Sequence, residues 1–184
     1  GYDCVFAGYG FMAEDADFVR LLEESGIRFI GPCSRVQEAA GRKDEAKRTA
    51  LRNRVSVTPG VNHAAALTLL ARHPTRTHLE ALARQHQLHP PPLAPGAREP
   101  TLEEFAEILL RAAGARRLDL FSIDDLGATL QAEAARLFAE HPGSRLRLKA
   151  VGGGGGKGQR LFADPAPVPA LVREILQEVK ATSP

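Results

Sequence analysis

The feature that most constrains the fold is a run of five glycines, Gly152–Gly156, within the stretch "LKAVGGGGGKGQR". Each ordered glycine costs roughly 0.5–1 kcal/mol of backbone entropy relative to alanine, so a folded chain needs a reason to keep such a run. The segment before it, "RLRLK", alternates apolar and basic residues, and "QRLF" after it alternates again, as strands do. The run therefore predicts a loop between two strands, whose bare amides can approach a phosphate as an anion-binding nest. Lys149, on the polar face of the first strand, would aim its ammonium at the same anions.

Other interpretations of the glycine run fit less well. A Walker A loop fails twice, because Val151 stands where its first glycine belongs and Gly158 replaces the hydroxyl residue that follows the lysine. Gly153, Gly155 and Gly158 match the dinucleotide fingerprint, but that motif needs a helix directly after the turn, where this chain has "QRLF". A flexible linker remains an alternative, although linkers usually contain Ser, Thr or Pro and lack flanking strands.

The first 60 residues alternate between strand and helix patterns. Residues 2–6 and 27–32 are short apolar segments typical of buried strands, and residues 14–25 have the spacing of an amphipathic helix. Ser34 and Gln37 match a capping box that would open a further helix, continuing through 44–53. Strand, helix, strand and helix with short links predict a parallel α/β unit.

The middle of the chain differs in character. Residues 61–100 contain five of the six histidines and read as a helical stretch followed by the proline-rich link "HPPPLAPGAREP". Two further capping boxes, Thr101 with Glu104 and Ser122 with Asp125, each predict a helix, and residues 168–179 predict a last one. The histidines lack acidic or cysteine partners at familiar spacings, so we expect solvated surface side chains and no metal ligands in the chain.

Composition excludes several classes of partner. The net charge is +2, from 24 basic and 22 acidic residues, which gives no electrostatic case for nucleic acid or an anionic membrane. No apolar run approaches the ~20 residues of a membrane-spanning helix. Cys4 and Cys33 are too few for a disulfide framework, so a reduced cytoplasmic location is expected. Because the chain starts directly in a strand pattern, we expect an internal fragment of a longer protein.

Five segments together resemble one known family. "LKAVGGGGGKGQR" is similar to the glycine-rich flap of biotin carboxylases, the ATP-grasp component of acetyl-CoA, propionyl-CoA and pyruvate carboxylases. "GYGFMAEDADF", "GIRFIGP", "GRKDEAK" and "VSVTPG" resemble four other segments of that family, in the same order and with similar spacing. The resemblance covers about residues 1–60 and 145–180.

The resemblance implies an α/β fold in three parts. Residues 1–60 would end a Rossmann-like N-terminal domain that precedes the ATP-grasp fold, and 145–184 would begin the ATP-grasp lid. Residues 61–144 would be a divergent, mostly helical and proline-rich insertion between them. The implied activity of the parent protein is an ATP-dependent ligase reaction, in which Mg-ATP and bicarbonate carboxylate biotin by way of carboxyphosphate. Its implied partners are a biotin carboxyl carrier domain and a carboxyltransferase, in an oligomeric parent.

The resemblance also implies which residues bind the nucleotide. Lys43 and Lys149 match lysines that contact ATP in the family, and Glu14 matches a glutamate near the bicarbonate and biotin side of the site. The Mg²⁺ ligands and the catalytic residues are expected beyond Pro184, so the fragment is expected to be inactive alone. The flap glycines expected to contact the cofactor are Gly153, Gly154, Gly155, Gly156 and Gly158.

Departures from the family pattern keep two alternatives open. Asp15 stands where the family usually has Asn, and Arg42 replaces the Asp of its G-D-K segment. One alternative is another ATP-grasp enzyme, which joins a carboxylate to an amine. The other is a degenerate, non-catalytic homologue whose long insertion serves assembly.

Overall fold

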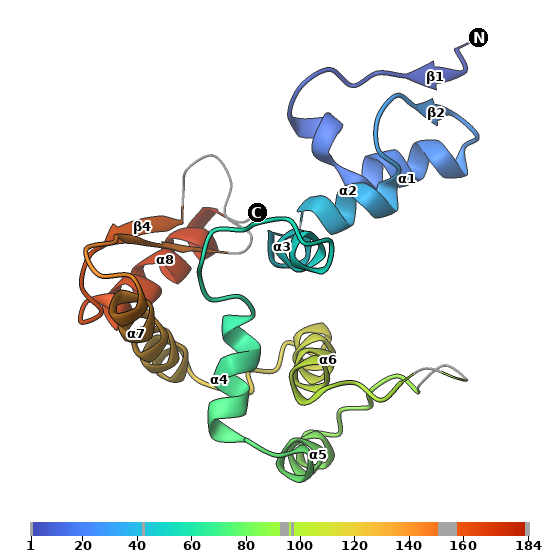
Figure 1. Cartoon of the computed structure of the whole chain (residues 1–184). Helices are drawn as coiled ribbons and strands as arrows, with labels where there is room; N and C mark the ends of the chain where they lie inside the picture. The colour runs from blue at the N-terminus through green and yellow to red at the C-terminus, as the bar shows by residue number, and fades with distance from the viewer. Residues whose placement is uncertain (1, 42, 93–95, 97, 151–157, 183–184) are drawn as a thin grey trace. The chain divides into compact units, whose positions relative to one another are not determined.

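The computed structural model describes residues 2–41, 43–92, 96, 98–150 and 158–182, with side chains described outside 43–45 and 182. The chain divides into two compact units, residues 1–59 and 60–184 (Figure 1). The predicted three-part division, with a further boundary between 144 and 145, stays a prediction. None of the helices in these described ranges is long and apolar enough to cross a membrane.

The first unit is a small parallel strand–helix–strand arrangement. Strands β1 (Cys4–Val5) and β2 (Arg28–Phe29) pair in parallel, with Cys4 opposite Arg28 and Val5 opposite Phe29. Between them lie a 3₁₀ turn, η1 (Phe11–Glu14), and helix α1 (Ala16–Glu24). Helices α2 (Ser34–Gly41) and α3 (Lys43–Arg52) follow. The predicted parallel pairing is confirmed, although both strands are shorter than the sequence pattern suggests.

The core of the first unit is thin. Val19 and Leu22 are buried on one face of α1, and the rings of Phe18 and Phe29 meet edge to face with centroids 6.5 Å apart. Several aromatic side chains of the same unit are exposed instead. These are Tyr2, Phe6, Tyr9 and Phe11.

The predicted capping box, in which Ser34 and Gln37 would bond to each other's backbone at the start of α2, is wrong, because both residues bond to other elements. Ser34 donates to the Glu23 carboxylate from both its backbone N–H (3.1 Å) and its hydroxyl (2.6 Å), and these bonds lower the pKa of Glu23. Gln37 donates its amide to the carbonyl of Ala13 at 2.7 Å. The two side chains therefore tie α2 to α1 and η1, because burial next to those elements offers them partners that an isolated helix end lacks.

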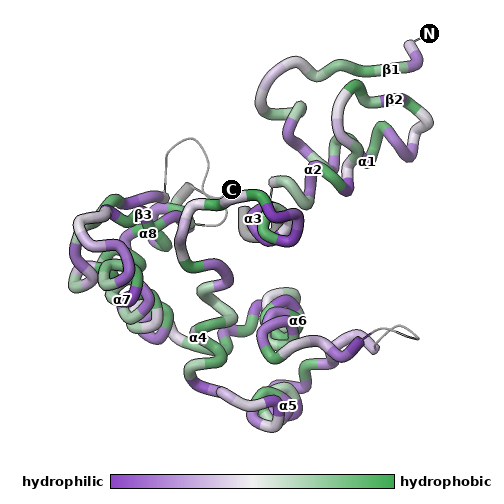
Figure 2. Tube along the Cα trace, viewed as in Figure 1, coloured by the Kyte–Doolittle hydropathy of each residue, from purple (hydrophilic) through white to green (hydrophobic). Residues whose placement is uncertain are grey.

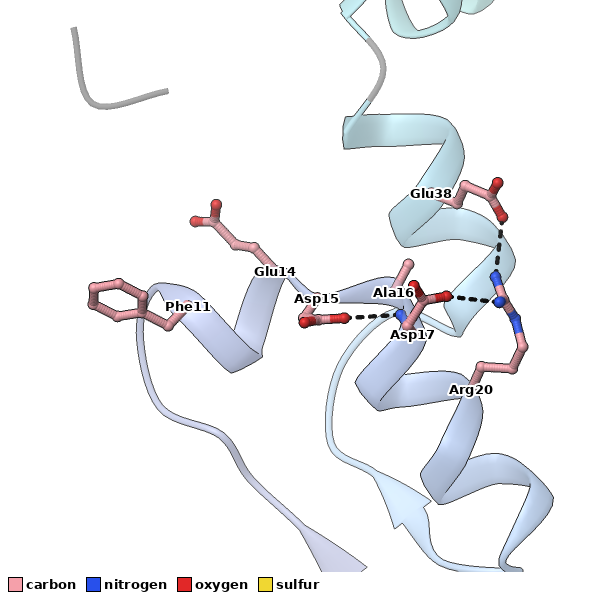
Figure 3. A pocket seen from close by; sticks show the side chains of 7 residues that line it. All are labelled: Phe11, Glu14, Asp15, Ala16, Asp17, Arg20 and Glu38. Carbon is pink, nitrogen blue, oxygen red and sulfur yellow. Dashed lines mark hydrogen bonds and ion pairs between the residues drawn. The ribbon is translucent and has the colours of Figure 1, made fainter. Parts of the chain in front are cut away.

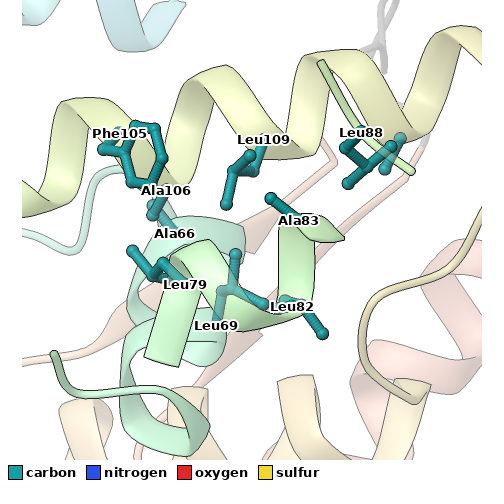
Figure 4. Close-up of a cluster of buried hydrophobic side chains, with 10 residues drawn as sticks. Ala66, Leu69, Leu79, Leu82, Ala83, Leu88, Phe105, Ala106 and Leu109 are labelled. Carbon is teal, nitrogen blue, oxygen red and sulfur yellow. The ribbon is translucent and has the colours of Figure 1, made fainter. Parts of the chain in front are cut away.

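The second unit begins with three helices around a leucine-rich core. Helix α4 (Ala64–Arg72) packs against α6 (Leu102–Ala115), and α5 (Arg76–Gln85) also contacts α6. The predicted Thr101–Glu104 capping box opens α6 and is confirmed. The core between these helices is drawn in Figure 4 and consists of Ala66, Leu69, Leu79, Leu82, Ala83, Leu88, Phe105, Ala106, Leu109 and Ala113.

The rest of the second unit pairs two helices with a hairpin. Helix α7 (Ile123–Glu140) packs along α8 (Val168–Thr182) and also contacts α4. The predicted Ser122–Asp125 capping box opens α7. Figure 2 shows purple and green alternating along α6 and α7, as in helices with one apolar face. The two strands of the hairpin are β3 (Leu146–Lys149) and β4 (Gln159–Phe162).

Helices α7 and α8 approach closely at one glycine. A Cβ placed on Gly127 would lie 3.1 Å from the Cα of Pro169, closer than most side chains tolerate. The absence of a side chain at 127 therefore lets the start of α8 lie directly on α7. Around this contact, Ala134, Val168 and Val172 form a second buried cluster.

Candidate functional site

The candidate site is the hairpin that carries the glycine run. Strands β3 and β4 are antiparallel, with Lys149 opposite Gln159 and Leu148 opposite Arg160. Beyond the last pair, the N–H of Ala150 donates to the carbonyl of Gly158 at 2.9 Å. The prediction of a strand on each side of the run is therefore confirmed, and the two strands pair with each other. Residues 151–157, which include Gly153, Gly154, Gly155 and Gly156, lie outside the described residues.

The two faces of the hairpin have different surroundings. Leu146, Leu148 and Phe162 pack against the cluster formed by α7 and α8. Arg147 and Lys149 are exposed on the opposite face, where Arg147 donates to the side-chain oxygen of Gln159 at 3.2 Å. Lys149 is thus an exposed cation on the last residue of β3, next to the start of the glycine run. This placement agrees with the predicted polar face of the strand.

The end of the hairpin is anchored to α8 by two carboxylates. Arg160 lies 3.0 Å from Glu178 through Nη2 and 3.6 Å from Glu174 through Nε. Gly158 has a left-handed backbone with φ 65° and donates its N–H to Oε1 of Glu178 at 3.2 Å. This amide, which we predicted to contact the cofactor, is bonded here to a carboxylate of the chain itself.

Sequence reasoning missed this anchor. Glu174 and Glu178 are spaced i, i+4 on α8, so both side chains project from the same face of the helix. That spacing and the basic residue in "QRLF" were the available signals, but nothing in the sequence brought the two segments together.

The predicted lysines are distributed over both units. Lys43 is the first residue of α3 in the first unit, and its side chain is not among those that the structure describes. Lys149 belongs to the second unit. Their shared contact with a nucleotide stays a prediction.

The first unit contributes a second candidate feature, the turn after β1. Gly8 and Gly10 have positive φ values of 75° and 72°, which an L-residue rarely adopts. Phe11 follows with φ 42° and a side chain that is 96% exposed. Phe11 is therefore a non-glycine residue in a sparsely populated backbone region, directly after two glycines that adopt positive φ.

An open pocket of about 560 Å³ lies beside this turn (Figure 3). Asp15 caps α1 in its wall, accepting hydrogen bonds from the N–H groups of Asp17 and Phe18 at 2.9 Å. Aspartate and asparagine serve equally well as N-caps, so this departure from the family pattern keeps the structural role. The residues that line the pocket are Phe11, Glu14, Asp15, Ala16, Asp17, Arg20 and Glu38.

The charges of this pocket disfavour an anion. Arg20 donates to Asp17 at 2.7 Å and to Glu38 at 3.3 Å, so its charge is already shared between two carboxylates. Glu14 and Asp15 add further negative charge, and Glu14 stands apart from the Arg20 network in Figure 3. By themselves, these residues favour a cationic or neutral group over bicarbonate.

Comparison with known sequences places residues 1–36 in a match to the family model described as biotin carboxylase, N-terminal domain. The mitochondrial pyruvate carboxylase of Rattus norvegicus is 45% identical over 62 residues, which is 34% of this chain and 5% of that protein. Biotin carboxylase 1 of Bacillus subtilis is 42% identical over 60 residues, which is 33% of this chain and 13% of that protein. The chain thus spans a small part of the curated relatives that it matches.

Solved structures extend the likeness to nearly the whole chain at the level of the fold. A biotin carboxylase–beta-gamma-ATP complex from Campylobacter jejuni matches 97% of this chain with a TM-score of 0.57 and 20% identity. The biotin carboxylase domain of Hydrogenobacter thermophilus 2-oxoglutarate carboxylase, in complex with MgADP and bicarbonate, matches 98% with a TM-score of 0.54 and 23% identity. The chain covers 26% of each of these structures.

These findings define the class of protein to which the chain is related. The α/β fold matches that of biotin carboxylases, and the N-terminal segment matches their N-terminal domain. The resemblance to the biotin carboxylase component of biotin-dependent carboxylases is confirmed, and it extends to pyruvate carboxylases among the relatives.

Proposed function

We propose that the chain is part of a biotin carboxylase that uses Mg-ATP and bicarbonate to carboxylate biotin. The observation that carries the proposal is the paired hairpin with Lys149 at the end of β3, directly before the glycine run. The similarity of residues 1–36 to the N-terminal domain of the same family supports it independently.

In the proposed reaction, a bicarbonate oxygen attacks the γ-phosphorus of ATP and ADP leaves. The carboxyphosphate breaks down to phosphate and CO₂, and a ureido nitrogen of biotin takes up the CO₂ as its proton is removed. Magnesium would neutralise phosphate charge, and its ligands are expected beyond Pro184. The partners would be a biotin carboxyl carrier domain and a carboxyltransferase.

The contribution of this chain would be binding and charge stabilisation. The Lys149 ammonium is exposed on the same strand face as Arg147, with Gln159 opposite on β4, and it would bind phosphate oxygens at the flap. Positive charge held next to phosphate oxygens stabilises the charge that builds up during phosphoryl transfer. Glu174 and Glu178 would serve indirectly, because they fix Arg160 and hence the end of β4.

One contact favours a second candidate function. In this alternative, the protein is a homologue that does not bind ATP and serves assembly. The Gly158 amide donates to Glu178, so a carboxylate already occupies a donor that a phosphate would use. A nucleotide would have to displace this carboxylate or bind through other amides. The two candidates differ in whether ATP binds at all.

The test uses the full-length protein that contains these residues, with bicarbonate-dependent ADP release measured in the presence and absence of free biotin. Lys149→Ala is expected to lower kcat/KM for ATP by at least about tenfold, the effect of removing one charge-stabilising contact. Lys180→Ala, which removes an exposed lysine from α8, is the matched control. ADP release independent of both bicarbonate and biotin would indicate another ATP-grasp ligase, and no ATP binding would support the assembly role.

A further inference from the structure

A histidine and two glutamates converge in the second unit, away from the hairpin. Nδ1 of His63 lies 2.7 Å from Oε1 of Glu107, and the ligand atoms of His63, Glu103 and Glu107 all lie within 4.8 Å of one another. The expectation that the histidines of residues 61–100 lie on the surface is wrong for His63, whose side chain is only 10% exposed. Its acidic partners are about 40 residues downstream, too distant in sequence for a spacing rule to detect.

The scaffold holds these three residues in place. His63 is the N-cap residue of α4, with a left-handed backbone at φ 58° and ψ 40°. Glu103 and Glu107 are one turn apart on α6, so their side chains share a helix face. Helices α4 and α6 are joined by the buried core, to which Leu69 and Leu109 contribute. The ligand atoms therefore come from rigid elements rather than from a loop tip.

Two of the three side chains are largely withdrawn from solvent. The Glu107 side chain is only 14% exposed, and a carboxylate removed from water is costly unless a positive charge or good donors compensate it. His63 and Arg111 both supply such groups, since His63 Nδ1 lies 2.7 Å from Glu107 Oε1 and Arg111 lies 3.9 Å from Glu107 Oε2. With Glu103 added, the group holds two carboxylates and one imidazole.

We propose that His63, Glu103 and Glu107 bind one divalent transition-metal ion of the Zn²⁺ class. Two carboxylates balance a double positive charge, and an imidazole nitrogen favours zinc-like ions over Mg²⁺ or Ca²⁺, which prefer oxygen ligands. Three protein ligands leave a fourth position for water, as in open zinc sites. The site would clamp the start of α4 to α6.

Small side-chain adjustments suffice to form such a site. Ligand atoms about 2.1 Å from a tetrahedral ion are roughly 3.4 Å apart. The His63–Glu107 pair at 2.7 Å would open slightly, and the most distant pair, within 4.8 Å, would close. Glu103 is exposed and free of the core, so it can make the larger movement.

The test is zinc binding by the untagged, chelator-treated chain, measured by titration calorimetry with ZnCl₂ in the presence of excess Mg²⁺. We expect one zinc ion per chain, and a rise in Tm of about 4 °C or more at saturating zinc. Replacing zinc with Co²⁺ provides a spectroscopic readout of the ligands, because visible absorption bands report their geometry.

Three variants identify the ligands. His63→Gln and Glu107→Gln are expected to weaken zinc binding at least about 100-fold, which exceeds the usual loss from a residue that merely orients a ligand. Glu103→Gln should weaken it at least about tenfold, and because Glu103 is exposed, this variant tests the site even if the other two fail to fold. His78→Gln, which removes an exposed histidine from α5, is the matched control and should bind zinc normally.

The proposal is overturned if the chain does not bind zinc, or if Glu103→Gln binds it as tightly as the unmodified chain. Binding that persists in Glu103→Gln would assign the metal to other groups, for example the exposed Cys4 and Cys33. Because no ATP or biotin is present, the outcome is independent of the carboxylase proposal.

Discussion

The first unit and the helices α4–α6 differ both in their match to a known family and in the size of their buried cores. Residues 1–36 match a known family, yet Val19 and Leu22 are the buried hydrophobic side chains among the described residues of that unit. The segment containing α4–α6 lies outside the residues that match the family model, yet it buries a cluster of ten residues. The segment that matches the family model is therefore not the segment with the larger buried core.

This difference between the two segments indicates which kinds of residue make a family recognisable from its sequence. In the first unit, the matching residues include glycines with positive φ and the strained Phe11, which shape a turn beside an open pocket. Such positions admit few residue types, so they are easily recognised in a sequence. A leucine core tolerates many combinations of similar volume, so its sequence carries little family signal.

The largest expected effect tests the depth of the α4–α6 core. Leu109 is fully buried, so Leu109→Ala should lower the free energy of unfolding by about 2–5 kcal/mol, measured by urea unfolding followed by circular dichroism. Leu21→Ala in α1, where the side chain is 61% exposed, is the matched change in the first unit and should cost less than about 0.5 kcal/mol. Equal losses in the two variants would contradict the burial of Leu109 in the α4–α6 core.

An intermediate effect is expected where α7 meets α8. Gly127→Leu would force a side chain against Pro169 and should destabilise the chain by about 1–3 kcal/mol, despite the better helix propensity of leucine. Gly114→Leu in α6 is the control, because a Cβ there meets no atom within 4 Å. It should be neutral or stabilise by up to about 1 kcal/mol. The Tm of both variants is compared with that of the unmodified chain. If Gly127→Leu is as stable as the unmodified chain, α7 and α8 can move apart enough to admit the leucine side chain.

The smallest effect concerns pH and the cap of α6. The guanidinium of Arg98 and the N–H of Thr101 donate to Glu104 and hold its pKa at about 2, below the ordinary value of 4.5. A lowered pKa in the folded state means that Glu104 contributes stability above about pH 4.5 and loses that contribution as the pH falls toward 2.

Glu104→Gln should therefore be less stable than the unmodified chain above about pH 4.5, by about 1 kcal/mol or less, and the two should converge near pH 2. Unfolding measured between pH 2 and 6 provides the comparison. Glu99→Gln, which removes a nearby exposed carboxylate, is the control. A stability difference that does not change with pH would contradict the role of the carboxylate in the cap.

Much of the fold was predictable from local sequence patterns. The capping boxes at Thr101 and Ser122 and the alternation on both sides of the glycine run are confirmed, because each depends on residues within a few positions of one another. The box at Ser34 failed for the opposite reason, since Glu23 and Ala13 offer its residues better partners in the folded state.

The candidate sites were only partly predictable. The position of Lys149 on the exposed face of β3 follows from the period of a strand. The contacts of Arg160 with Glu174 and Glu178, and of His63 with Glu107, join segments that are 14 to 44 residues apart. No local pattern encodes such contacts, because they arise only when elements distant in the sequence pack together.

The close approach at Gly127 has a consequence for how the hairpin is held in place. Pro169 rests on α7 at this point, while α8 holds the hairpin through Glu174 and Glu178. Helices α7 and α8 and the hairpin are thus linked through α8, which contacts α7 at Pro169 and the hairpin at Arg160. A change at Gly127 that moves α8 would therefore also move the two carboxylates that hold Arg160, so the position of β4 depends on a residue outside the hairpin.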